Sequence, residues 1–585
     1  MEVRSFYGVV AMFSLVALAA CSRSATSSAT AIPHLQKQGT AAHMIVDGKP
    51  FLMLGGELHN STTSSLDFAK TEWAQLAAMH LNTVLAPVYW ELLEPKEGQF
   101  DFALVDGQIQ AAQSNHLRLV FLWFGSWKNG MSSYVPVWVK TAQDRFPRAQ
   151  DKDGKSVELL STLSAANRDA DSRAFAVLMR HIKEVDTTHR VIMIQVENEV
   201  GFVGDSRDRS EAANKAFAGP APKELLDYLT SHKETLYPEF RKAWEAAGAK
   251  TSGTWEEVFG KAPYTDEIFT AWHYARYLDG VAAAGKAEYP LPMYVNAWCS
   301  FWGRSPGTSW NSGGPNPQVE DLWKLGAPAI DFRSPDMGGT LDIRSVVDWY
   351  HTPGLPLFIP EASGAAGAHN VFYAVGQHDA MGFSPFGIDG LLATLEPGVS
   401  TAPSGTRRAP ADLPLARSYA IVAQLAPLIL ENQGKGKMAG VIVIADDPPQ
   451  KIPLGNYVLE VSYTRGRRPP KPPAAKPAAG APAVPAPTPP PTRPQERAGA
   501  LFIAVGPDEY IVAGSGTVDV KFSPNTPGDP IAGIVSIDEG AFVEGRWVPG
   551  RRLNGDESDS NKALRLVGGT LPNGSIQRVK LYRYR

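Results

Sequence analysis

Eight short apolar segments, each followed by a longer stretch with helical patterning, constrain the fold of this chain most strongly. Each segment has the length of a buried strand. In the stretch 172–185, which lies between the third and fourth segments, Phe175, Leu178, Met179 and Ile182 fall on one helical face. Eight such repeats predict an α/β fold whose parallel sheet closes into a (β/α)8 TIM barrel. The segments are Phe51–Glu57, Thr83–Val88, Arg118–Phe124, Val191–Val196, Met293–Ala297, Ala329–Phe332, Leu357–Pro360 and Gly382–Phe386.

We expect the barrel to occupy residues 41–435, with a small hairpin over Met44–Gly48 before its first strand and a last helix over Leu413–Leu430. About ninety residues separate the fourth and fifth strands, far more than a usual connection. This insertion contains amphipathic stretches at 222–236 and 266–284. It is predicted to lie on the catalytic face of the barrel and to wall its pocket.

Beyond the barrel, short alternating segments punctuated by turns predict a smaller, β-sandwich-like domain over residues 436–585. Of the 26 residues 469–494, 12 are Pro, so residues 466–497 are expected to form a disordered insertion. Basic residues beside it leave open a contact with an anionic surface, although a solvated loop is the simpler interpretation. The alternating segments are Gly440–Ala445, Asn456–Tyr463, Leu501–Val505, Tyr510–Val512 and Gly516–Phe522.

The amino terminus has the charge order of a secretion signal. Arg4 precedes an apolar run over Val9–Ala20 that is too short for a permanent membrane span. The run ends Leu-Ala-Ala-Cys, which is similar to a bacterial lipobox with Cys21 as the lipidated residue; an ordinary cleaved signal is the alternative. Residues 1–21 are therefore predicted to be a lipoprotein signal peptide and residues 22–40 a flexible tether. The Ser that follows Cys21 favours an outer-membrane anchor, with the protein on the periplasmic side.

Composition narrows the classes of function. The formal net charge of −4 gives no indication of nucleic-acid binding. The twelve His residues show no ligand spacing, so neither a metal site nor a cofactor is predicted. Cys21 and Cys299 are the only cysteines, and lipidation of Cys21 would leave no pair for a disulfide.

Two of the predicted strands end on glutamates. The fourth runs into Glu-Asn-Glu at 197–199, and the seventh runs into Glu361. Because a buried carboxylate without a partner is costly, such strand ends indicate a pocket at the catalytic face of a barrel. Glycosidic bonds are cleaved by two carboxyl groups, one an acid and the other a nucleophile or base. Glu199 and Glu361 are the candidate catalytic pair, and Asn198 is placed to hydrogen-bond a sugar hydroxyl.

Several motifs resemble those of glycoside hydrolase family 35, the β-galactosidases. Residues 194–201, Ile-Gln-Val-Glu-Asn-Glu-Val-Gly, are similar to the family's acid/base motif, and residues 55–59, Gly-Gly-Glu-Leu-His, to its first strand. Residues 81–84 and 89–102 resemble two further motifs, so that the similarity covers roughly residues 41–430. The resemblance implies a retaining reaction with Glu199 as acid/base and Glu361 as nucleophile. The overall layout resembles a lipoprotein subgroup that ends in a domain of unknown function.

The sequence also departs from the family pattern. Pro87 and Asn60 replace two aromatic positions, and Ser126 replaces a Glu that often holds galactose hydroxyls. The sugar subsite must therefore be built differently. Candidate substrate-binding residues are Glu57 and His59 in the first-strand motif, and Trp127, Asn129 and Trp298 after the third and fifth strands. Trp127 and Trp298 are expected to be stacking platforms for sugar rings, with packing in the core as the alternative.

These observations favour a retaining exo-β-galactosidase that acts on oligosaccharides, with plant cell-wall xyloglucan fragments as the substrate that the resemblance implies. Two alternatives stay open. One is a glycosidase of another specificity, such as a β-glucosidase, β-mannosidase or endo-glycanase. The other is a lipid-anchored glycan-binding protein without catalysis. The sequence does not indicate an oligomeric state.

Overall fold

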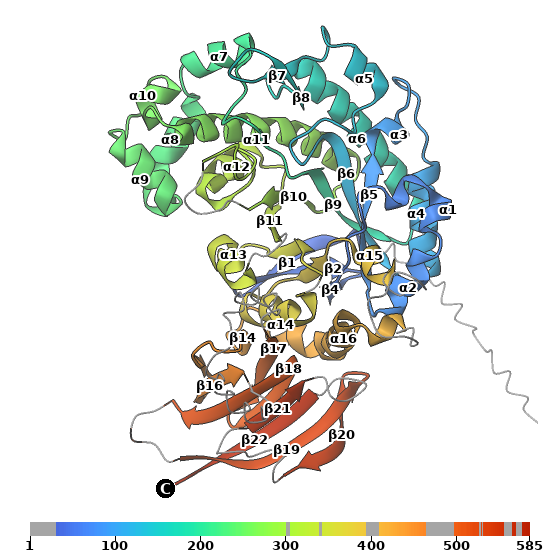
Figure 1. Cartoon of the computed structure of the whole chain (residues 1–585), viewed down its shortest axis with the longest axis vertical. Helices are drawn as coiled ribbons and strands as arrows, with labels where there is room; N and C mark the ends of the chain where they lie inside the picture. Colours follow the sequence, from blue (N-terminus) through green and yellow to red (C-terminus); the bar gives the residue numbers. More distant parts are fainter. Residues whose placement is uncertain are drawn as a thin grey trace, which may run out of the picture.

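The computed structural model of the chain describes residues 31–299, 305–337, 342–364, 366–393, 409–463, 496–525, 528, 531–554, 564–568 and 576–585. An eight-stranded parallel barrel surrounded by helices forms its larger part, and a smaller antiparallel β domain packs against one side of it (Figure 1). The predicted fold class is thereby confirmed. The predicted signal peptide with Cys21 lies outside the described residues, and so does most of the predicted Pro-rich insertion.

The barrel strands lie in the order β4-β13-β12-β11-β10-β9-β6-β5. The ring closes between the first and second strands, where Glu57 forms a parallel bridge with Leu85 and the Leu85 N–H donates to the Gly56 carbonyl over 2.9 Å. The strands are buried almost throughout, because helices cover their outer side and side chains fill the interior. Their bounds are β4 Met53–Leu54, β5 Thr83–Tyr89, β6 Arg118–Lys128, β9 Val191–Asn198, β10 Met293–Trp298, β11 Phe332–Met337, β12 Phe358–Ala362 and β13 Gly382–Pro385.

The sixth barrel strand, β11, lies further along the chain than the predicted segment Ala329–Phe332. The side chain of Asp331 accepts hydrogen bonds from the Met293 N–H and the Lys286 Nζ, each over 2.7 Å, and thereby fixes the loop before the strand. The strand itself reads Phe-Arg-Ser-Pro-Asp-Met and lacks an apolar run. As a consequence, the polar residue Asp336 stands near its carboxyl end.

Helices follow the strands and cover the outside of the barrel. The predicted helical stretch 172–185 is part of α6 (Ala165–Val185), which buries Phe175, Leu178, Met179 and Ile182 as expected. The other helices around the barrel are α1 Leu66–Ala69, α2 Glu72–Ala78, α3 Trp90–Leu93, α4 Ala103–Ser114, α5 Val137–Thr141, α12 Glu320–Gly326, α13 Ile343–Tyr350, α14 Gly367–Gln377, α15 Ile388–Ala393 and α16 Pro414–Asn432. A two-stranded ribbon, β7 (Arg148–Gln150) and β8 (Ser156–Leu160), precedes α6.

The long connection between β9 and β10 carries five helices. The last of them, α11 (Pro263–Glu288), packs against α6, where Gly285 lies on the ring of Phe175. The shorter helices lie beside it (Figure 1). They are α7 Glu211–Ala218, α8 Lys223–Ser231, α9 Pro238–Ala246 and α10 Trp255–Phe259. Among the described residues, no helix combines the length and the apolar character needed to cross a membrane.

A three-stranded sheet precedes the barrel. It consists of β1 (His34–Gln38), β2 (Ala41–Val46) and β3 (Lys49–Phe51), so the hairpin expected around residues 44–48 has an additional strand. The expected flexible tether over residues 22–40 is therefore wrong for His34–Gln38. The physical reason is that β1 pairs along its whole length with β2, while the Gln38 Nε2 donates to the Leu430 carbonyl over 2.9 Å. Met44 and Val46 of β2 join the apolar cluster inside the barrel.

The carboxyl-terminal domain is a sandwich of antiparallel strands. Its longest strand, β18, takes part in two sheets: residues 509–515 pair with β17 and β22, and residues 516–524 pair with β16 and β21. The sequence predicts two separate segments here, Tyr510–Val512 and Gly516–Phe522, whereas the structure has one continuous strand. The strands are β14 Met438–Ile444, β15 Gln450–Leu454, β16 Tyr457–Tyr463, β17 Arg497–Gly506, β18 Glu509–Pro524, β19 Ile531–Val543, β20 Arg546–Leu553, β21 Leu564–Gly568 and β22 Ile576–Tyr584.

The two domains contact each other closely through α14, the helix that follows the strand β12 with Glu361. Gly440 and Gly499 of the β domain lie against the backbone of this helix. A Cβ atom at Gly440 would lie 2.4 Å from the Phe372 carbonyl oxygen, and one at Gly499 would lie 2.3 Å from that of His369. The β domain therefore supports the helix behind the predicted nucleophile.

Candidate active site

The structure brings the two predicted catalytic glutamates together at the carboxyl ends of their strands. Glu199 follows β9, and Glu361 lies in β12. One carboxylate oxygen from each lies within 4.8 Å of the other, and an oxygen of Asp336 lies within the same distance of both. Retaining glycosidases have their two carboxyl groups roughly 5–5.5 Å apart, so the separation fits that class.

The backbone that presents Glu199 has an unusual conformation. Glu197 and Glu199 have φ angles of 61° and 44°, a region that side chains other than glycine seldom adopt. Hydrogen bonds fix both residues. The Glu197 carboxyl accepts from the N–H groups of Ser126 and Trp127, while the Glu199 N–H donates to Asn296 Oδ1 over 2.9 Å. The strand end is thus held in the turn that points Glu199 toward Glu361.

Four carboxyl groups share the centre of the barrel with one lysine. They belong to Glu57, Glu199, Asp336 and Glu361, and Lys128 acts on all four. Burial raises the pKa of Glu199 to about 8, and the nearby charge of Glu361 adds to this effect. Burial also raises the pKa of Glu361, and the positive charge of Lys128 opposes the rise. The acid is therefore kept protonated near neutrality while the negative charge rests best on Glu361.

For Glu57 and Asp336, burial followed by the charge of Glu361 raises each pKa well above its usual value. Both groups are fully enclosed in the barrel. A single lysine cannot neutralise four carboxylates, and burying an unpaired charge is costly. Burial and the charge of Glu361 thus both favour the protonated forms of Glu57 and Asp336.

Asn198 contacts Lys128 through its side chain and directly precedes the predicted acid, Glu199, in the chain. Its Oδ1 accepts a hydrogen bond from Lys128 Nζ over 2.7 Å, which leaves its Nδ2 without a partner among the described residues. An amide that donates from a fixed orientation suits a sugar hydroxyl beside the reacting carbon. Asn198 thus precedes Glu199 with its Nδ2 unpartnered among the described residues, and its contact with a sugar hydroxyl stays a prediction.

Several other buried polar atoms of the barrel interior also lack a hydrogen-bond partner within the described part of the chain. Buried polar groups normally have partners, so each such atom calls for an explanation. A ligand with many hydroxyl groups, such as a sugar, would provide partners for a whole set of them. They include both carboxyl oxygens of Glu57, Oδ1 of Asp336, Oε2 of Glu361, the Tyr294 hydroxyl, and the Oγ atoms of Ser334 and Ser384.

The structure contradicts the expected role of Trp127 as a stacking platform for sugar rings. It is 0% exposed, its ring packs edge-on against Tyr274 and Tyr277 of α11, and its Nε1 donates to the Leu160 carbonyl. It therefore belongs to the core between β6 and the outer helices. Trp298 differs, because it is 42% exposed at the end of β10 and pairs in register with Asp336. Of these two tryptophans, only Trp298 is exposed and available to stack on a sugar ring.

The remaining predicted residues are His59 and Asn129. His59 Nδ1 lies 2.8 Å from Asp389 Oδ1, and its side chain is 51% exposed. Asn129 is exposed in the turn after β6, where its N–H donates to the Asn198 carbonyl over 3.1 Å. Both belong to the rim of the barrel mouth.

Ser126 does not take over the place of the family's Glu. Its Oγ donates to Asp171 Oδ2 over 2.5 Å and lies 2.8 Å from the Tyr277 hydroxyl, so it faces α6 and α11. A bulge in β6 between Trp123 and Lys128 changes which side chains point inward. Through this bulge Lys128, which the sequence analysis missed, enters the site.

Asp336 was missed as well, because the sixth strand lacks an apolar run. Glu199, Asp336 and Glu361 are the one group of three potential metal-ligating side chains found in the described residues. We assign no metal to it, since the positive charge of Lys128 already acts on these carboxyl groups. The expectation that the reaction needs neither metal nor cofactor stays a prediction.

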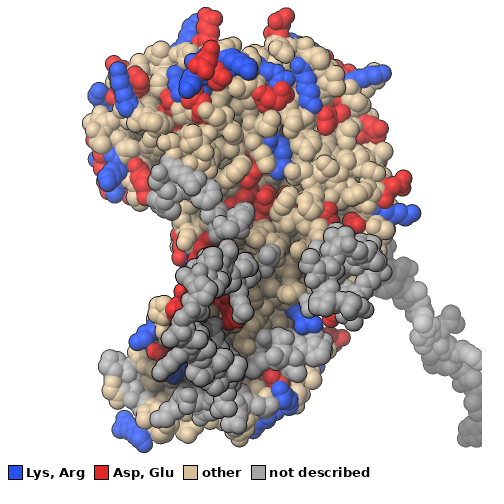
Figure 2. Space-filling model, viewed as in Figure 1, with Lys and Arg blue, Asp and Glu red and all other residues tan. Residues whose placement is uncertain are grey.

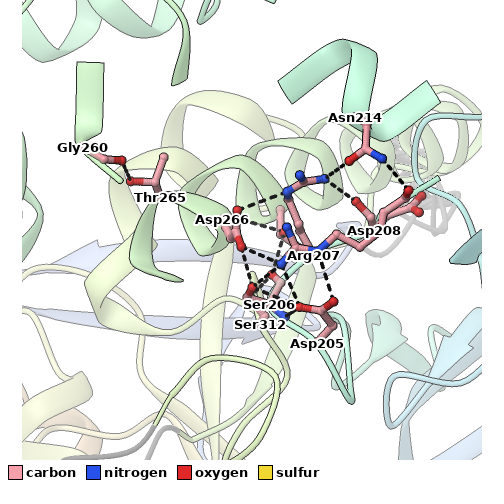
Figure 3. A network of polar contacts seen from close by, with 11 residues as sticks. Asp205, Ser206, Arg207, Asp208, Asn214, Gly260, Thr265, Asp266 and Ser312 are labelled. Atoms are coloured by element: carbon pink, nitrogen blue, oxygen red, sulfur yellow. Dashed lines mark hydrogen bonds and ion pairs between the residues drawn. The ribbon is translucent and has the colours of Figure 1, made fainter. Parts of the chain in front are cut away.

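A partly buried polar network fixes the loop that follows Glu199 (Figure 3). Asp266 of α11 accepts from Ser206, Arg207 and Arg209 over 2.6–3.1 Å. Ser206 in turn accepts through its carbonyl from Ser312 Oγ over 2.5 Å. The loop after β9, the long helix of the insertion and the segment after β10 are thereby joined into one wall at the catalytic end.

Acidic side chains are visible in a recess near the middle of the molecule (Figure 2). The recess lies over the region of β10 and β11 in the same view (Figure 1). Paired carboxyl groups at the carboxyl ends of barrel strands are the arrangement with which a class of enzymes, the glycoside hydrolases, cleaves glycosidic bonds.

Comparison with known proteins shows which protein families parts of the chain resemble. The model of "Glycosyl hydrolases family 35" matches residues 43–235, which include Glu199, and a "Domain of unknown function (DUF5597)" matches residues 415–565. The matched residues 43–235 include the first four barrel strands. Glu361 lies beyond the matched residues.

Two relatives are β-galactosidases by name. The chain is 28% identical to "Beta-galactosidase" of Xanthomonas manihotis over 198 residues, 33% of this chain and 30% of that protein. It is 26% identical to "Beta-galactosidase 8" of Oryza sativa subsp. japonica over 214 residues, 35% of this chain and 29% of that protein. The chain therefore covers less than a third of the length of either relative. A crystal structure of β-galactosidase from Bacillus circulans sp. alkalophilus aligns with a TM-score of 0.43 and 14% identity, over 65% of this chain and 57% of that one.

Proposed function

We propose that the protein is a retaining exo-β-galactosidase that removes terminal β-galactose from oligosaccharides. The observation that carries the proposal is the approach of Glu199 and Glu361, whose carboxyl oxygens lie within 4.8 Å of each other. Glu361 attacks the anomeric carbon while Glu199 gives its proton to the leaving oxygen. Glu199 then takes a proton from the water that releases the sugar.

The sugar specificity rests on two supports. Relatives over the first part of the barrel are β-galactosidases by name. In addition, Glu57 supplies two unpartnered buried oxygens beside the catalytic pair, a replacement for the Glu that Ser126 displaces. We propose that Glu57 and Asn198 hold hydroxyls of the reacting sugar, that Trp298 stacks on the next ring, and that His59 and Asn129 belong to the rim.

The exo mode is supported by the wall that the network around Asp266 fixes over the catalytic end. Plant cell-wall xyloglucan fragments are the substrates we propose, from the resemblance to the lipoprotein subgroup. The lipobox-like sequence Leu-Ala-Ala-Cys supports lipidation at Cys21, and the Ser that follows it supports an outer-membrane location on the periplasmic side.

A panel of 4-nitrophenyl β-glycosides, read beside galactosylated xyloglucan oligosaccharides, tests the proposal. We expect turnover of the β-galactoside and release of galactose from the oligosaccharides. Turnover of the glucoside or mannoside alone would assign another specificity, which the changes at Asn60, Pro87 and Ser126 would explain. Sugar binding without turnover on any glycoside would show a binding protein instead.

A further inference from the structure

Two side-chain amides from other parts of the chain hold the main-chain polar groups of Glu199. The Glu199 N–H donates to Asn296 Oδ1 over 2.9 Å, and the Glu199 carbonyl accepts from Asn311 Nδ2 over 2.5 Å. Asn296 lies in β10, whereas Asn311 lies in the segment that follows β10, 112 residues from Glu199 in the chain. Both amides are buried, so water does not compete for these hydrogen bonds.

The conformation of Glu199 depends on such contacts. The regular strand β9 ends at Asn198, and Glu199 itself has a φ angle of 44°. A residue other than glycine stays in this region only where its surroundings hold it there. Because the backbone angles set the direction in which the side chain leaves the chain, a change at this peptide would move the carboxyl group of Glu199 relative to Glu361. The groups that hold the peptide therefore hold the acid.

Both neighbours of Asn311 in the chain are anchored. The Trp310 Nε1 donates to Glu267 Oε1 of α11 over 2.7 Å. Ser312 exchanges two main-chain hydrogen bonds with Phe202, each over 2.9 Å, in the loop that follows Glu199. An amide between two anchored residues has little freedom to move. Its donor is thus already oriented toward the Glu199 carbonyl.

Glycines leave room for the amide of Asn311. A Cβ atom at Gly201 would lie 2.6 Å from the Asn311 Cβ, and one at Gly130 would lie 3.4 Å from the Asn311 Nδ2. Gly201 and Gly130 have φ angles of 135° and 64°, which glycine adopts readily. The loop after β9, the turn after β6 and the segment after β10 therefore meet at this side chain.

We propose that Asn311 is a positioning residue that holds the acid Glu199 in place through its main-chain carbonyl. The inference rests on the proposed function and deepens it. In the first step Glu361 bonds to the anomeric carbon, the bond to the leaving oxygen breaks, and that oxygen takes the proton of Glu199. In the second step water adds to the anomeric carbon, the bond to Glu361 breaks, and the proton of the water goes to Glu199. Asn311 acts in both steps only through the position of Glu199.

The test compares Asn311→Ala and Asn311→Asp in the full chain on two substrates with different leaving groups. Alanine removes the donor, and aspartate, which has nearly the same size, places an acceptor against the carbonyl. Phenyl β-galactoside needs the proton of Glu199, so we expect its kcat/KM to fall by about tenfold to 100-fold. The kcat/KM for 2,4-dinitrophenyl β-galactoside should fall by less than about threefold, because this leaving group needs no proton.

A second measurement uses the other role of Glu199, as the base for water. In the variants, kcat and KM for 2,4-dinitrophenyl β-galactoside should fall together, because the covalent intermediate on Glu361 accumulates. Azide needs no base: it attacks the anomeric carbon, the bond to Glu361 breaks, and β-galactosyl azide forms. We expect azide to raise kcat in both variants and to leave that of the wild type unchanged. Loss of folded protein alone would produce neither effect.

Asn167→Asp is the matched control. Asn167 of α6 is also buried, and its Nδ2 also donates to main-chain carbonyls, those of Pro147 and Ser161, over 3.1 and 2.9 Å. We expect this variant to lower the melting temperature, as Asn311→Asp does. The ratio of kcat/KM on the two galactosides should stay at the wild-type value, and azide should have no effect.

Two results with an active wild type would overturn the inference alone. One is an equal loss of kcat/KM on both galactosides in the Asn311 variants. The other is a wild-type ratio without any effect of azide. If Asn311→Asp does not fold, Asn311→Ala decides, and a failure of both to fold would assign Asn311 to the fold and contradict the inference. Silence of the wild type on every glycoside would instead overturn the proposed function.

Discussion

Lys128 Nζ donates to Asn198 Oδ1 over 2.7 Å, which places the positive charge of the lysine beside the acid and the nucleophile alike. Lys128 is itself buried, so its charge acts through a medium of low polarity where electrostatic effects are strong. It lowers the pKa of Glu361, whose carboxylate is the attacking group. The nearby charge of Lys128 explains how Glu361, one of four neighbouring carboxyl groups, stays ionised.

Replacing Lys128 by Met should therefore raise the pKa of Glu361 and reduce the fraction of charged nucleophile. We expect the acidic limb of the kcat/KM profile to move to higher pH. At acidic pH, the activity should fall about tenfold if the pKa of Glu361 rises by about one. Lys128→Arg keeps the charge and should retain more activity at low pH. An unchanged acidic limb in Lys128→Met would contradict this role.

The basic limb of the same profile should report on Glu199. Its pKa is raised to about 8, so the acid is protonated below that value and loses its proton above it. Activity toward galactosides with poor leaving groups should fall as the pH rises through about 8. Glu199→Ala should lose about 100-fold or more on such substrates and far less on 2,4-dinitrophenyl β-galactoside. Equal losses on both substrates would argue against proton donation by Glu199.

Replacing Glu57 should change the stability and the activity of the protein in opposite directions. Both of its buried oxygens lack a partner in the described chain, and an unsatisfied buried polar group costs about 1–3 kcal/mol. Glu57→Leu should therefore raise the melting temperature while kcat/KM falls by about 100-fold or more, since the sugar loses a partner for its hydroxyls. Glu57→Gln, which retains a donor and an acceptor, should lose less. A melting temperature that falls sharply in Glu57→Leu would show that Glu57 supports the fold instead.

The two tryptophans provide a matched pair, because one is buried and the other exposed. Trp298→Ala should raise KM for oligosaccharides several-fold with little change in melting temperature, as expected for a stacking surface. Trp127→Ala should destabilise the protein by about 3–5 kcal/mol, because it empties a packed site against Tyr274 and Tyr277. Thermal unfolding and initial rates on one galactosylated oligosaccharide distinguish the two roles. Equal effects of the two substitutions on KM would contradict the assignment.

Much of the fold could be predicted because buried strands and amphipathic helices have simple periodic patterns. Seven of the eight barrel strands overlap their predicted segments over most of their length, whereas β11 shares only Phe332 with the predicted one. That strand lies inside the barrel's catalytic centre and is rich in polar residues. Because this strand carries polar residues of the catalytic centre, it lacks the apolar pattern on which the prediction depends.

The site was predictable only where a residue's role follows from its position at a strand end. Glu199 and Glu361 stand directly after apolar runs, and the structure brings them together. Trp127 follows an apolar run too, but the bulge in β6 turns it toward α11 and brings Lys128 inward. The bulge depends on Gly125, where a Cβ would lie 2.6 Å from the Glu197 carboxyl, a contact between segments 72 residues apart that no local pattern shows.

Labelling the nucleophile tests the central claim most directly. Incubation with 2,4-dinitrophenyl 2-deoxy-2-fluoro-β-galactoside slows release of the sugar, so a retaining enzyme accumulates its covalent intermediate. We predict one fluorogalactosyl group per chain, attached to Glu361 and identified by mass spectrometry of the peptide, with Glu361→Ala unlabelled. Turnover of galactosides without any label, or a label on a residue other than Glu361, would contradict the account.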